Sequence, residues 1–344
     1  MLTDVMQNNS FISHNGRQIP RVSTDLSRAD KFGDIKVRLA YGRMRYTVEP
    51  RIYAVGEPNA ESPVFVSANY KLSFNRLRSR LVGLDGWILV LDTKGINVWC
   101  AAGKGTFGTE ELVGRIEQVH LGEIVAHRKL ILPQLSAPGV SAHAVKQQSG
   151  FRVIYGPVRS DDIPAFLDSG MKATEQMRRV EFPLADRAVL IPVELISWGK
   201  YVLVAAVCLL VLAGLNRDGY SARLIVSDGL RSAGILLGGL LAAAVLGPVL
   251  LPWLPGRAFS VKGLWIGLAM SLGLGLWGSR SNIPGLIAWF LMIPALTSFV
   301  VMNFTGASTY TSLSGVKREM RIAVPAQLIC AVAGVGLWLV ARFV

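Results

Sequence analysis

The stretch "GWILVLDTKGINVWCAAGKGTFGTEELVGRIEQVH", residues 86–120, decides the fold of the N-terminal half of this chain. It opens with an apolar run at 86–92 that has the length and composition of a buried strand. A glycine-rich turn follows, and a helical pattern then begins at Thr109, a good N-cap residue, with Glu110 and Glu111 in the first turn. A strand, a turn and a helix in this order form the repeating unit of an α/β sheet.

The flanking sequence repeats this alternation. Strand-like runs lie at 63–68, 128–133 and 151–156, and helical patterns lie at 71–83 and 161–170. The pattern predicts a mostly parallel, Rossmann-like α/β sheet covered by helices on both faces. Because ligands of such sheets bind outside the carboxyl ends of the strands, we expect the glycine-rich loops there to form the site.

The C-terminal half has a different character, because from Ser197 onward it consists of apolar runs of about 20 residues, the length that crosses a bilayer. None of these runs contains an acidic residue. The predicted spans are 197–215, 232–254, 259–277, 285–304 and 322–344. They predict an all-α five-helix transmembrane domain.

We therefore predict four parts. Residues 1–44 form an irregular N-terminal segment that faces lipid or a partner, and residues 45–182 form the α/β domain. Residues 183–196 are a connector in which Pro183 and Pro192 interrupt regular structure. Residues 197–344 form the transmembrane domain.

The formal net charge is +13, and most of the excess lies after residue 197. Anionic lipid headgroups explain basic membrane loops, and we expect no nucleic-acid binding because no basic stripe is interleaved with aromatic residues. The first twenty residues contain no apolar leader. We therefore expect a multi-pass protein of the inner (cytoplasmic) membrane with its α/β domain in the cytoplasm.

Residues 95–111 resemble two nucleotide-binding motifs, and neither fits well. A P-loop requires glycine at the position of Val98 and a magnesium-binding hydroxyl at the position of Gly105. Gly103, Gly105 and Gly108 do form a G-x-G-x-x-G pattern, but Glu123 precedes a predicted strand, whereas the acidic residue of a dinucleotide site ends the second strand.

Cys100 leaves two interpretations open. It is either a small buried residue at the end of a strand, or a thiolate ligand for a soft metal. Trp99 and Phe107 flank three glycines and Lys104. This composition favours the second interpretation, because a flat ligand can approach glycine backbone closely beside aromatic surface.

The stretch "NVWCAAGK" at 97–104 resembles the cap-helix signature of the HgcA family, the membrane-anchored corrinoid proteins of microbial mercury methylation. That family also has five spans after its corrinoid domain. The segments "ANYKLSF", "APGVSAHAVK" and "GFRVIYGPVR", together with residues 86–109, are similar to the corrinoid-binding domain of the corrinoid iron-sulfur protein large subunit.

The resemblance implies that a cobalamin-type corrinoid binds this domain, with Cys100 as the axial cobalt ligand and the catalytic residue. The cofactor-binding residues it implies lie in the cap helix and the turn after it, and in a later loop. They are Asn97, Val98, Trp99, Cys100, Ala101, Gly103, Lys104, Gly105, Thr106 and Phe107, followed by Ala137, Pro138, Gly139, Val140 and Ser141.

The activity that the resemblance implies is a corrinoid-dependent methyltransferase of an anaerobe, which moves a methyl group from cobalt to inorganic Hg(II) and releases methylmercury. The alternative is a membrane-bound corrinoid methyl carrier in one-carbon metabolism resembling the acetyl-CoA pathway. A third class, a transporter or sensor with a nucleotide-binding domain, is disfavoured because the spans lack the acidic residues of ion pathways.

The resemblance also implies partners. The chain lacks a cysteine-rich cluster domain, so we expect no iron-sulfur cluster in it. Electrons would then come from a small ferredoxin-like protein of the HgcB type with two 4Fe–4S clusters. The methyl group would come from a donor protein that uses methyltetrahydrofolate.

Overall fold

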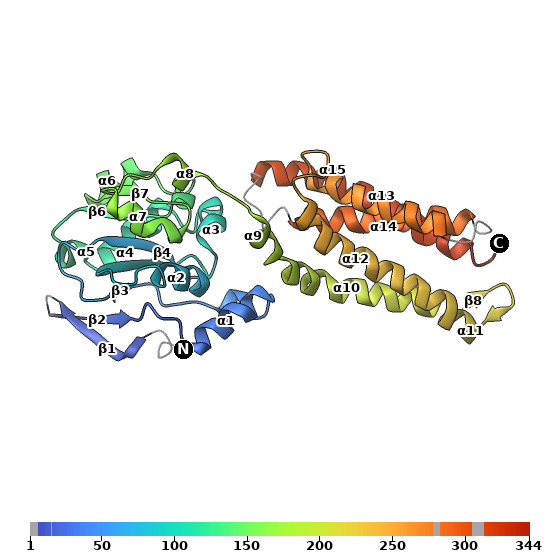
Figure 1. The fold of residues 1–344 in the computed structure, drawn as a ribbon, viewed down its shortest axis with the longest axis horizontal. Helices are drawn as coiled ribbons and strands as arrows, with labels where there is room; N and C mark the ends of the chain where they lie inside the picture. Colours follow the sequence, from blue (N-terminus) through green and yellow to red (C-terminus); the bar gives the residue numbers. More distant parts are fainter. Residues whose placement is uncertain (1–5, 15, 278–282, 305–312) are drawn as a thin grey trace. The chain divides into compact units, whose positions relative to one another are not determined.

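A computed structural model describes residues 6–14, 16–277, 283–304 and 313–344. The chain divides into two compact units, residues 1–180 and residues 181–344 (Figure 1). The first unit is an α/β domain and the second is helical.

The α/β domain is built on a seven-stranded sheet with the order β1-β2-β3-β5-β4-β6-β7. Strands β5, β4, β6 and β7 run parallel to one another, as do β2 and β3, whereas β1 is antiparallel to β2 and β3 is antiparallel to β5. The strands are β1 (Met6–His14), β2 (Arg17–Val22), β3 (Ile52–Val55), β4 (Val64–Ala68), β5 (Gly86–Leu91), β6 (Lys129–Leu132) and β7 (Arg152–Tyr155). The predicted mostly parallel sheet is confirmed.

Helices pack on both faces of the sheet because side chains of a strand alternate in direction. Val66 of β4 lies in one core cluster with Leu112, whereas Phe65 lies in another with Phe74 and Phe166. The first face carries α3 (Val98–Lys104), α4 (Thr109–Gln118), α5 (Leu121–Ile124) and α6 (Ala142–Ser149). The second carries α2 (Lys71–Arg78) and α7 (Ile163–Asp168).

The chain reverses its direction across the sheet at β4. From β4 it passes through α2 to β5 on one side, and from β5 it returns past β4 through α3, α4 and α5 to β6 on the other side. Ligands of open α/β sheets bind at such a switch point, outside the carboxyl ends of the strands. Helix α3 follows β5 and contacts the short 3₁₀ helix η2 (Gln134–Ser136), which follows β6. The carboxyl ends of these strands therefore carry the segments predicted to form the site.

The N-terminal segment is more regular than predicted. Strands β1 and β2 form a hairpin, and β2 joins the sheet by pairing with β3. Helix α1 (Arg28–Arg38) begins with a capping box between Ser27 and Asp30, and the 3₁₀ helix η1 (Arg43–Arg45) follows it. The prediction of an irregular segment is wrong for these residues, because pairing with the sheet and capping supply order that apolar periodicity does not reveal.

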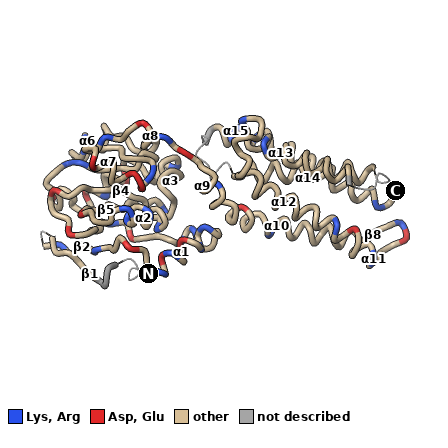
Figure 2. The backbone as a smooth tube through the Cα atoms, viewed as in Figure 1, with Lys and Arg blue, Asp and Glu red and all other residues tan. Residues whose placement is uncertain are grey.

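The second unit contains five helices that are long and apolar enough to cross a membrane among the residues described. The first runs from Leu184 through α10 (Ile191–Leu212), and the others lie in α12 (Leu230–Leu250) with the turns before it, α13 (Phe259–Trp277), α14 (Ile283–Asn303) and α15 (Leu313–Val340). Charged residues are sparse along these helices, which are mostly tan in Figure 2. The remaining elements of the chain are η3 (Ser160–Asp162), α8 (Glu175–Arg178), α9 (Leu184–Ala188), β8 (Leu215–Asn216), β9 (Gly219–Tyr220), α11 (Ala222–Leu224) and the π-helical η4 (Ile225–Gly229).

The predicted connector at 183–196 is largely helical, because it contains α9 and the first turns of α10. Pro183 is the N-cap of α9, and Pro192 lies in the first turn of α10. Proline is favoured there because a first-turn N–H has no partner within its own helix. The two prolines therefore start helices, and the expectation that they interrupt regular structure is wrong.

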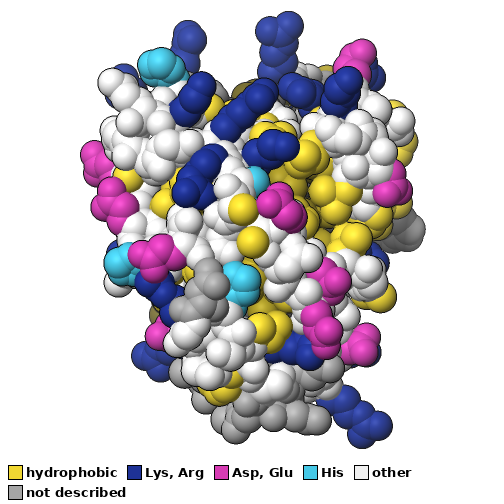
Figure 3. All heavy atoms as spheres, turned by 90° about the vertical axis from the view of Figure 1, so that its left-hand side faces the viewer, with side chains coloured by type: hydrophobic (Ala, Val, Ile, Leu, Met, Phe, Trp, Pro, Cys, Tyr) yellow, Lys and Arg dark blue, Asp and Glu magenta, His cyan; other side chains and the backbone are white. Residues whose placement is uncertain are grey.

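Figure 3 shows one face of the molecule, on which Lys and Arg side chains gather mainly at the top of the view. Asp and Glu side chains lie at both sides of this face, and hydrophobic side chains lie between them. This face therefore carries both positive and negative charges, whereas the surface of a protein that binds a nucleic-acid backbone is predominantly basic.

Candidate functional site

The loop from β5 to α3 is held by Asn69, which follows β4 and is 6% exposed. Its side-chain oxygen accepts hydrogen bonds from the backbone N–H groups of Thr93 at 3.1 Å and Gly95 at 3.0 Å, and from Thr93 Oγ1 at 2.9 Å. Its amide nitrogen donates to Asp92 Oδ1 at 3.1 Å. The end of the neighbouring strand therefore fixes the segment that leads into α3.

Helix α3 has a defined start and end. The side-chain oxygen of Asn97, the N-cap, accepts a hydrogen bond from the backbone N–H of Cys100 at 2.9 Å. The C-cap is Gly105 with a φ of 82°, a left-handed conformation that glycine adopts without a steric penalty. A helix thus lies where the resemblance implies a cap helix, with Cys100 in its first turn.

The two sides of α3 differ in exposure. Ala101 and Ala102 are 0% and 4% exposed and pack into the core of the domain. Cys100 is partly exposed, and Gly103 and Lys104, three and four positions later, are exposed. Residues three and four apart share a helix face. Cys100 therefore lies on the outer face of α3, on the same side as Gly103, a residue without a side chain.

The loop after η2 packs against the C-terminal end of α3. A Cβ atom on Gly139 would lie 2.3 Å from the carbonyl oxygen of Phe107 and 2.9 Å from Cα of Ala102. The backbone N–H of Ser141 donates to Oγ1 of Thr109 at 2.9 Å. Only glycine permits this approach at position 139, so the structure brings together the two segments predicted to form the site.

The predicted N-cap of α4 is displaced by one residue. The structure has Gly108 as the N-cap and Thr109 as the first helical residue. The prediction of Thr109 as the N-cap is wrong: its hydroxyl does not cap α4 but accepts a hydrogen bond from the backbone N–H of Ser141, a residue far away in sequence.

The predicted cofactor-binding residues fall into three groups by exposure. Ala101, Phe107 and Val140 are buried, and their side chains pack in the core, where they hold the two segments in place. The partly exposed residues are Asn97, Val98, Trp99, Cys100, Thr106, Ala137 and Gly139. The exposed residues are Gly103, Lys104, Gly105, Pro138 and Ser141.

Asn69 and Thr93 position α3, yet our sequence predictions do not include them. The signal for Asn69 is a polar residue directly after a buried strand, at the sheet edge where sites form. Thr93 has no comparable local signal, because its role depends on the bond to Asn69 across two strands.

The donor set at α3 fits a metal that brings most of its own ligands. Among the residues described, no group of three or more His, Cys, Asp or Glu side chains could hold a metal ion. A protein-only site for a soft metal uses three or four such side chains. Cys100 supplies one sulfur on an accessible helix face. This arrangement suits a metal held in a macrocycle that takes one further ligand from the protein.

The fold and the site together define a class: a Rossmann-like α/β domain with a single cysteine, Cys100, on the outer face of α3, joined in one chain to five helices long and apolar enough to cross a membrane. Residues 41–167 match the family described as the CO dehydrogenase/acetyl-CoA synthase delta subunit. This range contains α3 and the loop at 137–141, whereas the five long helices lie outside it.

Known proteins are similar to this chain over a comparable number of residues. The gamma subunit of the acetyl-CoA decarbonylase/synthase complex of Archaeoglobus fulgidus is 32% identical over 130 residues, which cover 37% of this chain and 27% of that protein. The gamma subunit from Methanopyrus kandleri is 32% identical over 123 residues, 35% of this chain and 26% of that subunit. The corrinoid/iron-sulfur protein large subunit of Moorella thermoacetica is 28% identical over 121 residues, 35% of this chain and 27% of that protein. The chain thus spans about a quarter of the length of these relatives.

Proposed function

We propose that this chain is a membrane-anchored corrinoid protein that carries a methyl group on cobalt and transfers it to an acceptor. One observation carries the proposal: the region that matches the CO dehydrogenase/acetyl-CoA synthase delta subunit family, residues 41–167, presents Cys100 on the outer face of α3. The donor set of the domain supports it, because one accessible thiol suits a metal held in a macrocycle.

In this proposal Cys100 binds cobalt, and its neighbours hold the thiol in place. The hydrogen bond from the Cys100 N–H to Asn97 fixes the first turn of α3, and buried Ala101 anchors the helix to the core. Gly103 leaves the outer face open to the flat ring. When bound, the corrinoid supplies a cobalt–methyl bond, and an anionic sulfur ligand on cobalt favours release of the methyl group with its bonding electrons.

The acceptor has two candidates. The relatives favour a carrier in one-carbon metabolism, since they are subunits of acetyl-CoA decarbonylase/synthase complexes and a corrinoid/iron-sulfur protein. The cap-helix sequence at 97–104 and the five long helices outside the matched region favour Hg(II), a soft cation that accepts a methyl group with its electrons. We propose Hg(II) as the acceptor and keep the one-carbon carrier as the alternative that the test separates.

The test uses the full chain with Cys208 and Cys330 replaced by alanine, so that Cys100 is its one remaining cysteine. This chain is loaded with methylcobalamin, its visible spectrum is recorded, and methylmercury is measured after Hg(II) is added. We expect a spectrum of sulfur-ligated cobalt and formation of methylmercury. The further change Cys100→Ala should abolish both the spectrum of sulfur-ligated cobalt and the formation of methylmercury. If neither signal changed, the proposed role of Cys100 would be refuted. If the spectrum showed cobalt bound through Cys100 but no methylmercury formed, Hg(II) would be refuted as the acceptor and the one-carbon carrier would be the supported function.

We also propose that a separate ferredoxin-like protein with two 4Fe–4S clusters reduces the cofactor, and that a methyltetrahydrofolate-dependent protein supplies the methyl group. The chain has three cysteines, fewer than one 4Fe–4S cluster uses. We place the five long helices in the cytoplasmic membrane and the α/β domain on its cytoplasmic side.

A further inference from the structure

Helix α1 and the turns after it expose an unusual number of large apolar side chains. Phe32 is 61% exposed, Ile35 54%, Leu39 38%, Tyr41 70% and Met44 62%. We call these five residues the docking face. Single exposed apolar residues are ordinary, but a group of them within one short segment marks an interaction surface.

Three residues of the docking face lie on one side of α1 and its C-cap. Phe32, Ile35 and Leu39 are spaced by three and four positions and so share the outer side of the helix. Val37 lies on the inner side and is 3% exposed. Because the core contacts of α1 are made by the inner side, the outer side is available for a partner.

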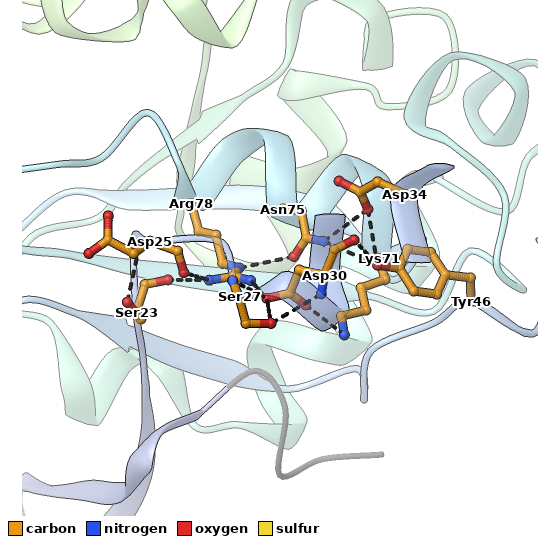
Figure 4. Close-up of polar contacts among 9 residues, drawn as sticks. All are labelled: Ser23, Asp25, Ser27, Asp30, Asp34, Tyr46, Lys71, Asn75 and Arg78. Carbon is orange, nitrogen blue, oxygen red and sulfur yellow. Dashed lines mark hydrogen bonds and ion pairs between the residues drawn. The ribbon is translucent and has the colours of Figure 1, made fainter. Parts of the chain in front are cut away.

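The acidic residues of α1 are turned away from the docking face. Asp30 is 1% exposed, with Oδ1 2.8 Å from Nζ of Lys71 and Oδ2 2.7 Å from a guanidinium nitrogen of Arg78 (Figure 4). Burial by itself would raise the pKa of Asp30, but the hydrogen bond from Lys71 and the charge of Arg78 outweigh it and hold that pKa below its ordinary value. Asp30 is therefore a buried anion whose charge is compensated inside the domain.

Asp34 is satisfied in the same way. Its Oδ1 accepts hydrogen bonds from the Tyr46 hydroxyl at 3.0 Å and from Nδ2 of Asn75 at 3.1 Å, as Figure 4 shows. Burial raises the pKa of Asp34 despite these two donors. Asp30 and Asp34 are the acidic residues between positions 28 and 45, so the outward charge of this segment is set by its basic residues.

The segment that holds the docking face also carries six basic residues, which we call the basic rim. They are Arg28, Lys31, Lys36, Arg38, Arg43 and Arg45. Nζ of Lys36 lies 5.3 Å from the ring centre of Phe32 and 5.1 Å from that of Tyr41, which places a cation beside two exposed aromatic rings. An apolar centre with a cationic rim is the surface of an interfacial helix on anionic lipid.

We propose that the docking face rests on the anionic headgroup layer of the bilayer that the second unit of this chain spans. The apolar side chains enter the boundary between headgroups and acyl chains, and the basic rim pairs with lipid phosphates. The first unit ends at Val180 and the first candidate span begins at Leu184, so this short tether keeps the bilayer at high effective concentration near the α/β domain. A second copy of the chain fits less well, because two cationic rims repel each other.

The proposal is tested with the full chain in nanodiscs of phosphatidylcholine, with or without phosphatidylglycerol. A photoreactive benzoylphenylalanine replaces Ile35, or replaces Val82 as the control, a 67% exposed apolar residue outside the docking face. We expect lipid adducts at position 35 that increase with phosphatidylglycerol, and few at position 82. Equal adduct yields at the two positions, or adducts at position 35 only to protein, would overturn the proposal.

A second variant tests the basic rim. Replacing Lys31 and Lys36 by glutamine should lower the lipid adducts at position 35 by roughly fivefold per lysine, the change that corresponds to about 1 kcal/mol for each basic residue near an anionic surface. Lys146→Gln, at an exposed site on α6, is the control and should leave the yield unchanged. An equal loss of lipid adducts in the Lys146→Gln control, or no loss when Lys31 and Lys36 are replaced, would contradict a role for these two charges.

Discussion

Replacing Gly139 by alanine tests whether the contact between the later loop and α3 shapes the site. The new Cβ would lie 2.3 Å from the Phe107 carbonyl oxygen and 2.9 Å from Cα of Ala102, against an ordinary contact distance of at least 3.4 Å. Both neighbours are backbone atoms, so neither can rotate away. The loop must therefore move by about 1 Å from α3, a forced overpacking that costs about 1–3 kcal/mol.

We expect this cost to appear in corrinoid binding, since the proposed site requires α3 and the loop together. A cost of about 1–3 kcal/mol corresponds to roughly 5- to 150-fold weaker binding. Binding is measured by spectroscopic titration of the purified full chain, and its thermal unfolding is measured in parallel. The visible spectrum of the bound cofactor should stay sulfur-ligated, because Cys100 remains.

Gly114→Ala is the matched control. A Cβ atom at Gly114 meets no other atom within 4 Å, and the residue lies inside α4. Alanine there should stabilise the domain by about 0.5–1 kcal/mol and leave cofactor binding unchanged, because glycine weakens a helix interior. If Gly139→Ala bound the corrinoid as tightly as the natural chain, the proposed place of the cofactor beside α3 and this loop would be wrong.

Three further predictions concern the scaffold. Asn97→Ala removes the cap of α3 and should lower the stability of this helix by about 1 kcal/mol, measured as faster amide exchange at Cys100. Asn97→Asp should retain the cap and the slower exchange. Equal exchange rates in the two variants would exclude a capping role for Asn97. Asp30→Ala leaves Lys71 and Arg78 buried without their anion and should destabilise the domain by about 3–5 kcal/mol in thermal or chemical unfolding, whereas a neutral effect would show that the cluster is not needed. Because folding lowers the pKa of Asp30, its stabilising contribution is complete above the ordinary value of 3.8 and is lost as the pH falls through the pKa of the folded state. The difference in unfolding free energy between the natural chain and Asp30→Ala should therefore become smaller in acid. A difference that grows in acid would contradict the lowered pKa.

Local sequence determined much of the architecture. The apolar runs at 63–68, 86–92 and 128–133 correspond to β4, β5 and β6, because buried parallel strands need continuous apolar residues. The long apolar runs correspond to the five helices that are long and apolar enough to cross a membrane, since such a run has the length that a bilayer requires of a helix. Asn97 and Gly105 mark the ends of α3 by their own side-chain and backbone chemistry.

Only the tertiary structure decided the contacts between remote residues. The sequence did not reveal the hairpin of β1 and β2, because its residues gain order by pairing with the sheet edge. Nor did it show that Gly139 meets α3, or that Asp30 is enclosed by Lys71 and Arg78. Periodicity records which residues are buried within one element, whereas charge pairing and backbone contact depend on which elements the topology places side by side.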